Sequence, residues 1–66
     1  MWQYGFTWDG STNIYWFDNA GVRDRYADEL DQIIGVPVRK YVNRSGVRFA
    51  NVTAKTDIQY DYIMEE

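Results

Sequence analysis

Residues 2–8 alternate strictly between aromatic side chains and small or polar ones, in the order Trp-Gln-Tyr-Gly-Phe-Thr-Trp. A period of two residues is typical of a β-strand with one apolar face. The sequence Asp9-Gly10-Ser11 follows, and aspartate and glycine accept the backbone angles that a tight turn needs. Residues 14–17 then predict a returning strand. We therefore expect a β-hairpin, and the other elements of the fold have to pack against it.

A three-residue loop in this hairpin would place Phe6 opposite Ile14. Six large side chains would then share one face of the hairpin: Trp2, Tyr4, Phe6, Trp8, Ile14 and Trp16. Stripes of this kind usually belong to a core, so we expect this face to pack against a helix. Tyr15 and Phe17 would point the other way and leave aromatic surface exposed.

A helix is predicted after the hairpin, because apolar residues recur at spacings of three and four positions over residues 22–34. The residues of this apolar face are Val22, Tyr26, Ala27, Leu30, Ile33 and Ile34. Asp18 or Asn19 would cap the start of the helix. Gly35 can adopt the left-handed conformation that ends a helix, and Pro37 prevents its continuation.

Two further strands, Val36–Val42 and Val47–Val52, are rich in β-branched residues, and residues 43–46 between them are typical of a hairpin turn. Residues 57–64 alternate again and predict a fifth strand. The predicted fold is a single α+β domain over residues 1–66, with the element order ββαβββ. Its sheet of four or five strands is mostly antiparallel, and one helix packs across one face.

The chain has 66 residues, which is near the lower size limit for a domain that folds on its own core. It contains no cysteine and no histidine, so disulfides, the usual zinc sites and thiol nucleophiles are excluded. Three Trp, six Tyr and three Phe residues have to supply the buried area instead. The sequence also has no Gly-rich phosphate loop and no calcium-loop spacing. We therefore expect a protein that is not an enzyme and that uses no cofactor and no metal.

Targeting signals are not evident in the sequence. The N-terminal residues lack the basic segment and the apolar segment of a signal peptide. The longest uninterrupted apolar run, Ile-Tyr-Trp-Phe at residues 14–17, is far too short to span a bilayer. We expect a cytoplasmic protein that does not enter a membrane.

Charge is distributed unevenly along the chain, whose formal net charge is -3. Residues 1–31 hold six acidic and two basic side chains. Residues 32–56 hold five basic side chains and no acidic one, and residues 57–66 hold four acidic side chains. A basic segment is thus flanked by acidic segments, which indicates either internal pairing or two oppositely charged surfaces.

Within the predicted helix, Asp24, Asp28 and Asp31 form a stripe on the side opposite the apolar face. This stripe could be a solvated surface, or its acids could form weak ion pairs with the basic segment. It could also present spaced negative charge to a surface that normally grips nucleic acid. The protein-binding residues would then be Asp24, Asp28, Asp31, Asp57 and Asp61, with Tyr60 and Tyr62 as anchors.

Residues 39–49 carry four cations in the predicted second hairpin. A nucleic-acid interface there would use Arg39, Lys40, Tyr41, Arg44 and Arg48, since single-strand binders combine cationic and aromatic side chains. The negative net charge opposes the approach of a polyanion. The alternatives are that the segment balances the acidic end of the helix, or that its charges protect a sheet edge from aggregation.

The sequence carries no family motif. In its size, acidity, absence of cysteine and aromatic richness, it resembles the small phage-encoded proteins that inhibit host factors, including anti-CRISPR proteins and DNA mimics. The resemblance implies a non-catalytic inhibitor or adaptor that binds a larger, nucleic-acid-binding protein in the host cytoplasm. Two alternatives are kept: a nucleic-acid-binding module that uses the basic hairpin, and a small structural subunit of a larger assembly.

Overall fold

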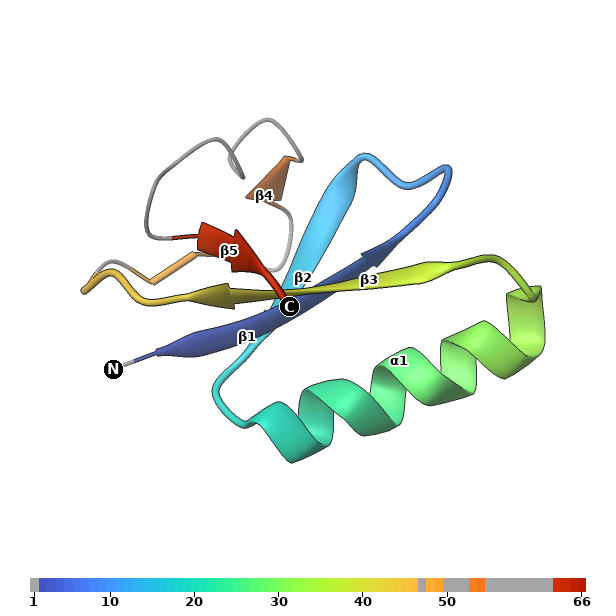
Figure 1. Ribbon diagram of the computed structural model, residues 1–66, viewed down its shortest axis with the longest axis horizontal. Helices are drawn as coiled ribbons and strands as arrows, with labels where there is room; N and C mark the ends of the chain where they lie inside the picture. Colours follow the sequence, from blue (N-terminus) through green and yellow to red (C-terminus); the bar gives the residue numbers. More distant parts are fainter. Residues whose placement is uncertain (1, 47, 50–52, 55–62) are drawn as a thin grey trace.

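The computed structural model describes residues 2–46, 48–49, 53–54 and 63–66. Over these residues the chain forms β1 (Gln3–Trp8), β2 (Asn13–Phe17), α1 (Ala20–Ile34), β3 (Val38–Asn43), β4 (Thr53–Ala54) and β5 (Ile63–Glu65) (Figure 1). The described strands form one sheet in the order β4-β2-β1-β3-β5, and every described pair is antiparallel. The predicted α+β class, the element order ββαβββ and the antiparallel sheet are confirmed.

The β1–β2 hairpin forms, but its register differs from the prediction by one residue. Phe6 lies opposite Tyr15, and Gly5 lies opposite Trp16. The reason is the loop, which has four residues, 9–12, where the prediction assumed three. A shift of one residue moves every side chain of a strand to the other face of the sheet.

The predicted single aromatic face is therefore wrong. Tyr15 and Phe17 lie on the same face of the sheet as Phe6, and this is the face that α1 covers. Ile14 and Trp16 lie on the opposite face. The hairpin consequently has two apolar faces, and both have to be covered.

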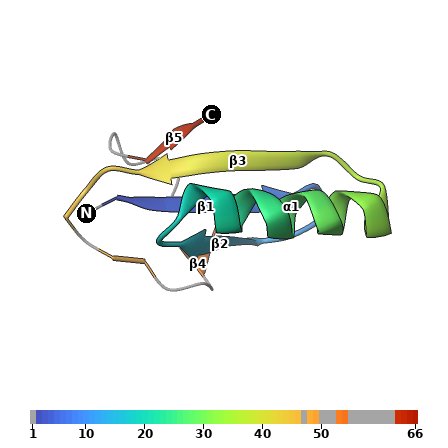
Figure 2. The ribbon, with the colours of Figure 1, turned by 90° about the horizontal axis from the view of Figure 1, so that it is seen from below.

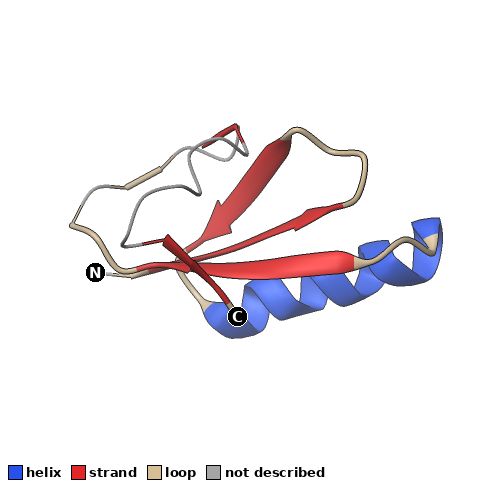
Figure 3. Ribbon diagram, turned by 45° about the horizontal axis from the view of Figure 1, so that its top comes forward, coloured by secondary structure: helices blue, strands red, loops and turns tan. Residues whose placement is uncertain are grey.

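Both predicted helix boundaries are confirmed. The side-chain Oδ1 of Asn19 accepts a hydrogen bond from the backbone N–H of Val22 at 3.1 Å and caps the start of α1. Gly35 ends the helix with a φ of 66°, and its N–H donates to the carbonyl of Asp31 at 2.8 Å. The helix lies along one face of the sheet (Figure 3).

The side of α1 that packs on the sheet differs from the predicted apolar face. Arg23 and Ala27 are its buried residues, at 2% and 1% exposure. Val22, Tyr26 and Ile33 keep 37%, 53% and 79% of their surface exposed. The small side chain of Ala27 allows close approach to the sheet, and Arg23 binds strand carbonyls. The helix is therefore rotated about its axis relative to the prediction.

The predicted hairpin between residues 36–42 and 47–52 is wrong where the structure describes it. β3 lies between β1 and β5, and Arg48 and Phe49 lie outside any strand. The backbone of Phe49 is instead held by the side chain of Gln3, with one hydrogen bond of 2.7 Å and one of 3.0 Å. Of the predicted fifth strand, residues 63 and 64 belong to β5, and residues 57–62 lie outside the described residues.

The most buried apolar side chains lie on the sheet face opposite α1. Ile14, Trp16, Tyr41 and Ile63 form a cluster with exposures between 0% and 6%. Phe49 packs against this cluster, and its ring centroid lies 5.7 Å from that of Trp16. On the other side of the sheet, α1 lies in front of β1, and β3 runs beside it in the same view (Figure 2). One helix covers that face only partly, which leaves apolar surface beside it.

Candidate protein-binding groove

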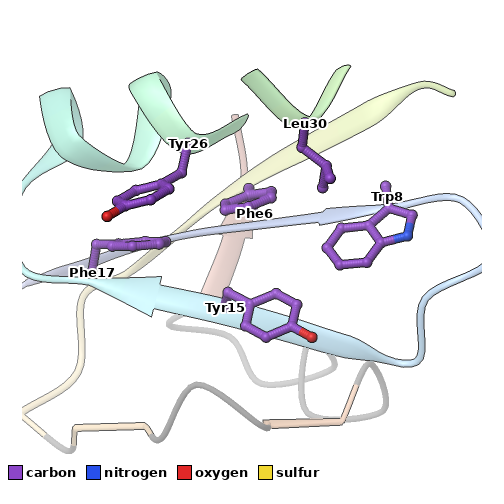
Figure 4. Close-up of a pocket in the computed structure, with 6 residues that line it drawn as sticks. All are labelled: Phe6, Trp8, Tyr15, Phe17, Tyr26 and Leu30. Carbon is purple, nitrogen blue, oxygen red and sulfur yellow. The ribbon is translucent and has the colours of Figure 1, made fainter. Parts of the chain in front are cut away.

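An open apolar groove lies between α1 and the β1–β2 hairpin (Figure 4). Its volume is about 280 Å³. It is lined by side chains from three elements: Phe6 and Trp8 of β1, Tyr15 and Phe17 of β2, and Tyr26 and Leu30 of α1. No lining side chain is charged, and the polar groups are two tyrosine hydroxyls and one indole N–H. Such a lining suits an apolar guest with few polar contacts.

The groove follows from the register of the hairpin and the position of the helix. The alternation of β1 and β2 places their four aromatic side chains on the α1 side. Arg23 fixes α1 to carbonyls of β1 and β3. The aromatic residues of β2 at the other side of the helix are then only half-buried. The groove is the uncovered part of this aromatic face.

The aromatic walls are held by stacking. Phe6 and Phe17 stack with centroids 5.9 Å apart, and Phe17 and Tyr26 stack at 5.4 Å. Trp8 and Tyr15 stack at 5.5 Å, with an angle of 3° between their planes. Pairs of this kind contribute about 0.5–1.5 kcal/mol each beyond the area that they bury. The walls are therefore positioned before any guest binds.

The apolar surface continues along the helix beyond the groove. Val22, Tyr26 and Ile33 are four and seven positions apart, so they share one side of α1. Their large exposed fractions make this side an apolar strip, about 16 Å long from Val22 to Ile33 at the rise of an α-helix. Exposed apolar side chains grouped on one side of a helix are typical of interaction sites on proteins.

A polar cluster centred on Arg23 holds the other side of the helix. Its Nη1 donates to the carbonyls of Gly5 and Tyr41 at 3.0 and 3.1 Å. Its Nε donates to Asp24 Oδ1 at 2.6 Å, and its Nη2 pairs with the carboxylate of Glu66. The Arg23 side chain is 3% exposed. This buried cation is compensated by two carboxylates and two carbonyls, so its role is structural.

The predicted acidic stripe is divided in the structure. Asp24 belongs to the Arg23 cluster and also accepts a bond from Lys40 Nζ at 3.1 Å. Burial raises the pKa of Asp24, but the hydrogen bonds from Lys40 and Arg23 outweigh this effect and the pKa is lowered overall. Asp28 and Asp31 are exposed and form no ion pair within the described part of the chain.

The other predicted protein-binding residues belong to the C-terminal segment. Asp57, Tyr60, Asp61 and Tyr62 lie outside the described residues. The structure therefore assigns them no position, and their role stays a prediction.

Cations of the basic segment pair with acids from elsewhere in the fold. Arg48 binds Asp18 through two hydrogen bonds of 2.6 and 3.2 Å, which lower the pKa of Asp18 and raise the pKa of Arg48. Arg39 lies 3.5 Å from Asp9, and Lys40 pairs with Asp24 as described above. The partner acids come from the hairpin loop and the start of the helix, whereas the sequence suggested the helix end.

The aromatic member of the predicted nucleic-acid interface is not at the surface. Tyr41 is 2% exposed in the core cluster, and burial is the main cause that raises the pKa of its hydroxyl. Its ring cannot stack on a base without leaving that core. Arg44 lies with its guanidinium carbon 4.8 Å from the centroid of the Trp2 ring, which is a cation–π contact within the chain.

Sequence reasoning did not identify the groove. It placed Phe6 and Trp8 in a common core with Trp16, and it placed Tyr26 and Leu30 on a buried helix face. The available signal was the expectation that Tyr15 and Phe17 leave aromatic surface exposed. The register of the hairpin places Tyr15 and Phe17 on the α1 side of the sheet, where they line the groove.

Comparisons with known proteins give no further guide to function. No group of three or more acidic residues that could hold a metal ion occurs among the residues that the structure describes. The described helix is not long and apolar enough to cross a membrane. Comparisons with protein-family models, curated proteins and solved structures find no match for this chain. Function therefore has to be argued from the surface of the molecule.

Proposed function

We propose that the protein is a non-catalytic binding module, an inhibitor or adaptor, and that a segment of a larger protein binds in the groove between α1 and the β1–β2 hairpin. The observation that supports this proposal is the open aromatic groove itself, continued along α1 by an exposed apolar strip. Tyrosine and tryptophan are the residue types that most often anchor protein interfaces. The absence of histidine and cysteine favours binding over catalysis.

A protein segment fits this surface better than a small molecule does. Small ligands are usually held in enclosed cavities that bury most of their surface. Here the groove is open, and the strip from Val22 to Ile33 extends past it. An amphipathic helix or an extended segment can place one apolar side chain in the groove and others along the strip.

The partner is expected to carry positive charge. The net charge of the chain is -3, and the cations Arg23, Arg39, Lys40 and Arg48 are paired with its own acids. The helix acids Asp28 and Asp31 are left for a basic surface, which fits a nucleic-acid-binding partner in the cytoplasm. The most specific function of this kind is that of a phage-type inhibitor that binds a nucleic-acid-binding protein of the host.

The test uses a displayed library of random peptides selected on the folded protein. The groove variant is Tyr26→Ser with Ile33→Ser. The matched control is Arg25→Ser with Gln32→Ser, which places the same number of serines at exposed positions of the same helix. Circular dichroism and thermal unfolding establish that both variants are folded before binding is compared.

We expect selected peptides that are rich in apolar residues, that bind the control like the wild type, and that bind the groove variant at least about tenfold more weakly, a difference of about 1.4 kcal/mol. Peptides that bind both variants equally would contradict the proposal. Binding of single-stranded nucleic acid that is lost in Arg44→Ala with Arg48→Ala would move the function to the basic segment.

A further inference from the structure

We infer that the groove selects a segment in which apolar side chains are followed closely by lysine or arginine, and that Glu29 pairs with this cation. The inference rests on the proposed function and names the chemistry of the partner at that same site. It makes Glu29 a specificity-determining residue on the exposed side of α1.

The position of Glu29 on α1 supports this role. It lies three positions after Tyr26 and four before Ile33, so it shares the exposed side of the helix with both residues. Glu29 is exposed, and within the described residues it forms no ion pair.

The other charges near the groove are already engaged or point elsewhere. Asp9 and Asp18 follow groove residues in the chain, but Arg39 and Arg48 pair with them. Arg25 is also exposed and lies four positions before Glu29, but it is turned about 100° around the helix axis from Tyr26, against about 60° for Glu29. Of the exposed charged residues of α1, Glu29 is therefore the nearest to Tyr26 around the helix axis.

A second copy of this chain fits the site less well than a basic partner does. A copy would have to offer an exposed apolar segment next to an available cation. In the described residues, four of the six cations are held in ion pairs and Arg44 lies over the ring of Trp2, which leaves Arg25, on the helix that already forms one wall of the groove. Two copies would also bring two negatively charged molecules together, since each carries a net charge of -3.

Leu30 offers a direct probe of the groove. It is the only leucine in the sequence, so selective methyl labelling of leucine gives NMR signals from the groove alone. Three synthetic peptides are titrated into the labelled protein: one that combines leucine with lysine, one that combines leucine with glutamate, and one that combines serine with lysine. Glu29→Gln is compared with Glu65→Gln, which removes the same charge from an exposed position on β5, at the edge of the sheet away from β2.

We expect the leucine–lysine peptide to shift the Leu30 methyl signals and to bind more tightly than the leucine–glutamate peptide. Glu29→Gln should weaken binding of the leucine–lysine peptide roughly twofold to fivefold, the size that one exposed ion pair supports, while Glu65→Gln should leave it unchanged. Added salt should reduce the preference for lysine.

The two levels of the proposal fail in different ways. Equal binding of the lysine and glutamate peptides at Leu30, or equal effects of Glu29→Gln and Glu65→Gln, would overturn the charge selection and leave the apolar groove as a binding site. Tight binding of the serine–lysine peptide without a shift at Leu30 would overturn the groove itself. Saturable self-association that shifts Leu30 in the absence of peptide would make a second copy the occupant and overturn the inference.

Discussion

The indole ring of Trp16 covers Gly5, its direct partner across the β1–β2 ladder. A Cβ atom at Gly5 would lie 2.7 Å from Trp16 Cε3 and 2.9 Å from Ile14 Cγ2, which is closer than such atoms pack. Trp16 and Ile14 are 3% and 0% exposed, so neither side chain has free space to move into. The absence of a side chain at Gly5 is what allows the buried cluster to close over the centre of the sheet.

Gly5→Ala should therefore lower the free energy of unfolding by about 1–3 kcal/mol, the usual cost of overpacking a core. The matched control is Gly46→Ala, because a Cβ atom at Gly46 meets nothing within 4 Å. That control should change stability by no more than about 0.5 kcal/mol. Urea denaturation of the two variants measures the difference, and equal midpoints would contradict the packing described for Trp16.

The substitution Arg23→Met keeps a long side chain between α1 and the sheet but removes the hydrogen-bond donors of the guanidinium group. The carbonyls of Gly5 and Tyr41 then lose these bonds in a buried setting, whereas the carboxylates of Asp24 and Glu66, which are 44% and 43% exposed, can be hydrated. We expect a loss of about 2–4 kcal/mol in the free energy of unfolding.

Arg23→Lys should also be destabilising, since one ammonium group does not reproduce the fork of the guanidinium. Arg25→Met is the control at an exposed helix position and should stay within about 0.5 kcal/mol of the wild type. If Arg23→Met unfolded at the same urea concentration as this control, the buried cluster would not contribute to stability.

The lowered pKa of Asp24 predicts that the free energy of unfolding depends on pH. Its pKa in the folded protein lies below the ordinary value of an aspartate, because the effect of burial, which raises the pKa, is outweighed by the hydrogen bonds from Lys40 and Arg23. A carboxyl group with a lowered folded pKa stabilises the protein above its unfolded pKa, and this stabilisation is lost as the pH falls through the folded pKa.

The free energy of unfolding of the wild type should therefore exceed that of Asp24→Asn by about 0.5–1.5 kcal/mol at about pH 6, and the excess should shrink towards about pH 2.5. Asp28→Asn removes the same charge from an exposed position. The difference in free energy of unfolding between this variant and the wild type should not change comparably with pH. A constant excess for Asp24 across this range would exclude the predicted linkage.

The side chain of Gln3, in β1, connects the segment after β3 to the sheet through hydrogen bonds. It is 2% exposed, its Oε1 accepts bonds from Phe49 N and Asn43 Nδ2, and its Nε2 donates to the carbonyl of Phe49. Gln3→Leu should cost about 2–4 kcal/mol, because buried polar groups lose their partner.

The readout is hydrogen exchange at the amide of Phe49, which should become much faster in Gln3→Leu than in the wild type. Gln32→Leu, at an exposed helix position, should change neither this exchange rate nor the stability by more than about 0.5 kcal/mol. Unchanged protection of Phe49 in Gln3→Leu would show that other contacts hold this segment.

Local signals in the sequence were sufficient for the helix boundaries. Asn19 and Gly35 act on the hydrogen bonds of their own helix ends, so the residue type alone indicates where α1 begins and ends. The same holds for the alternation in residues 2–8, which predicts β1 before any partner strand is known.

The candidate site depended on contacts between distant residues and was not predicted. Tyr26 belongs to the apolar pattern of the helix, yet it is 53% exposed beside the groove. The apolar pattern of the helix did not indicate that Arg23 would be buried against the sheet, because its hydrogen-bond acceptors are backbone carbonyls of β1 and β3. Backbone carbonyls leave no trace in the residue types of a sequence.

The sequence by itself determined the α+β class, the order of the elements and the ends of the helix, because each of these depends on short-range periodicity or on a cap. Only the tertiary structure decided the register of the hairpin and the rotation of α1. Three-residue and four-residue loops are both compatible with the sequence between the first two strands, and the observed register is the one that places Trp16 over Gly5. That single-residue shift moves Tyr15 and Phe17 to the helix side, where they complete the groove on which the proposed function depends.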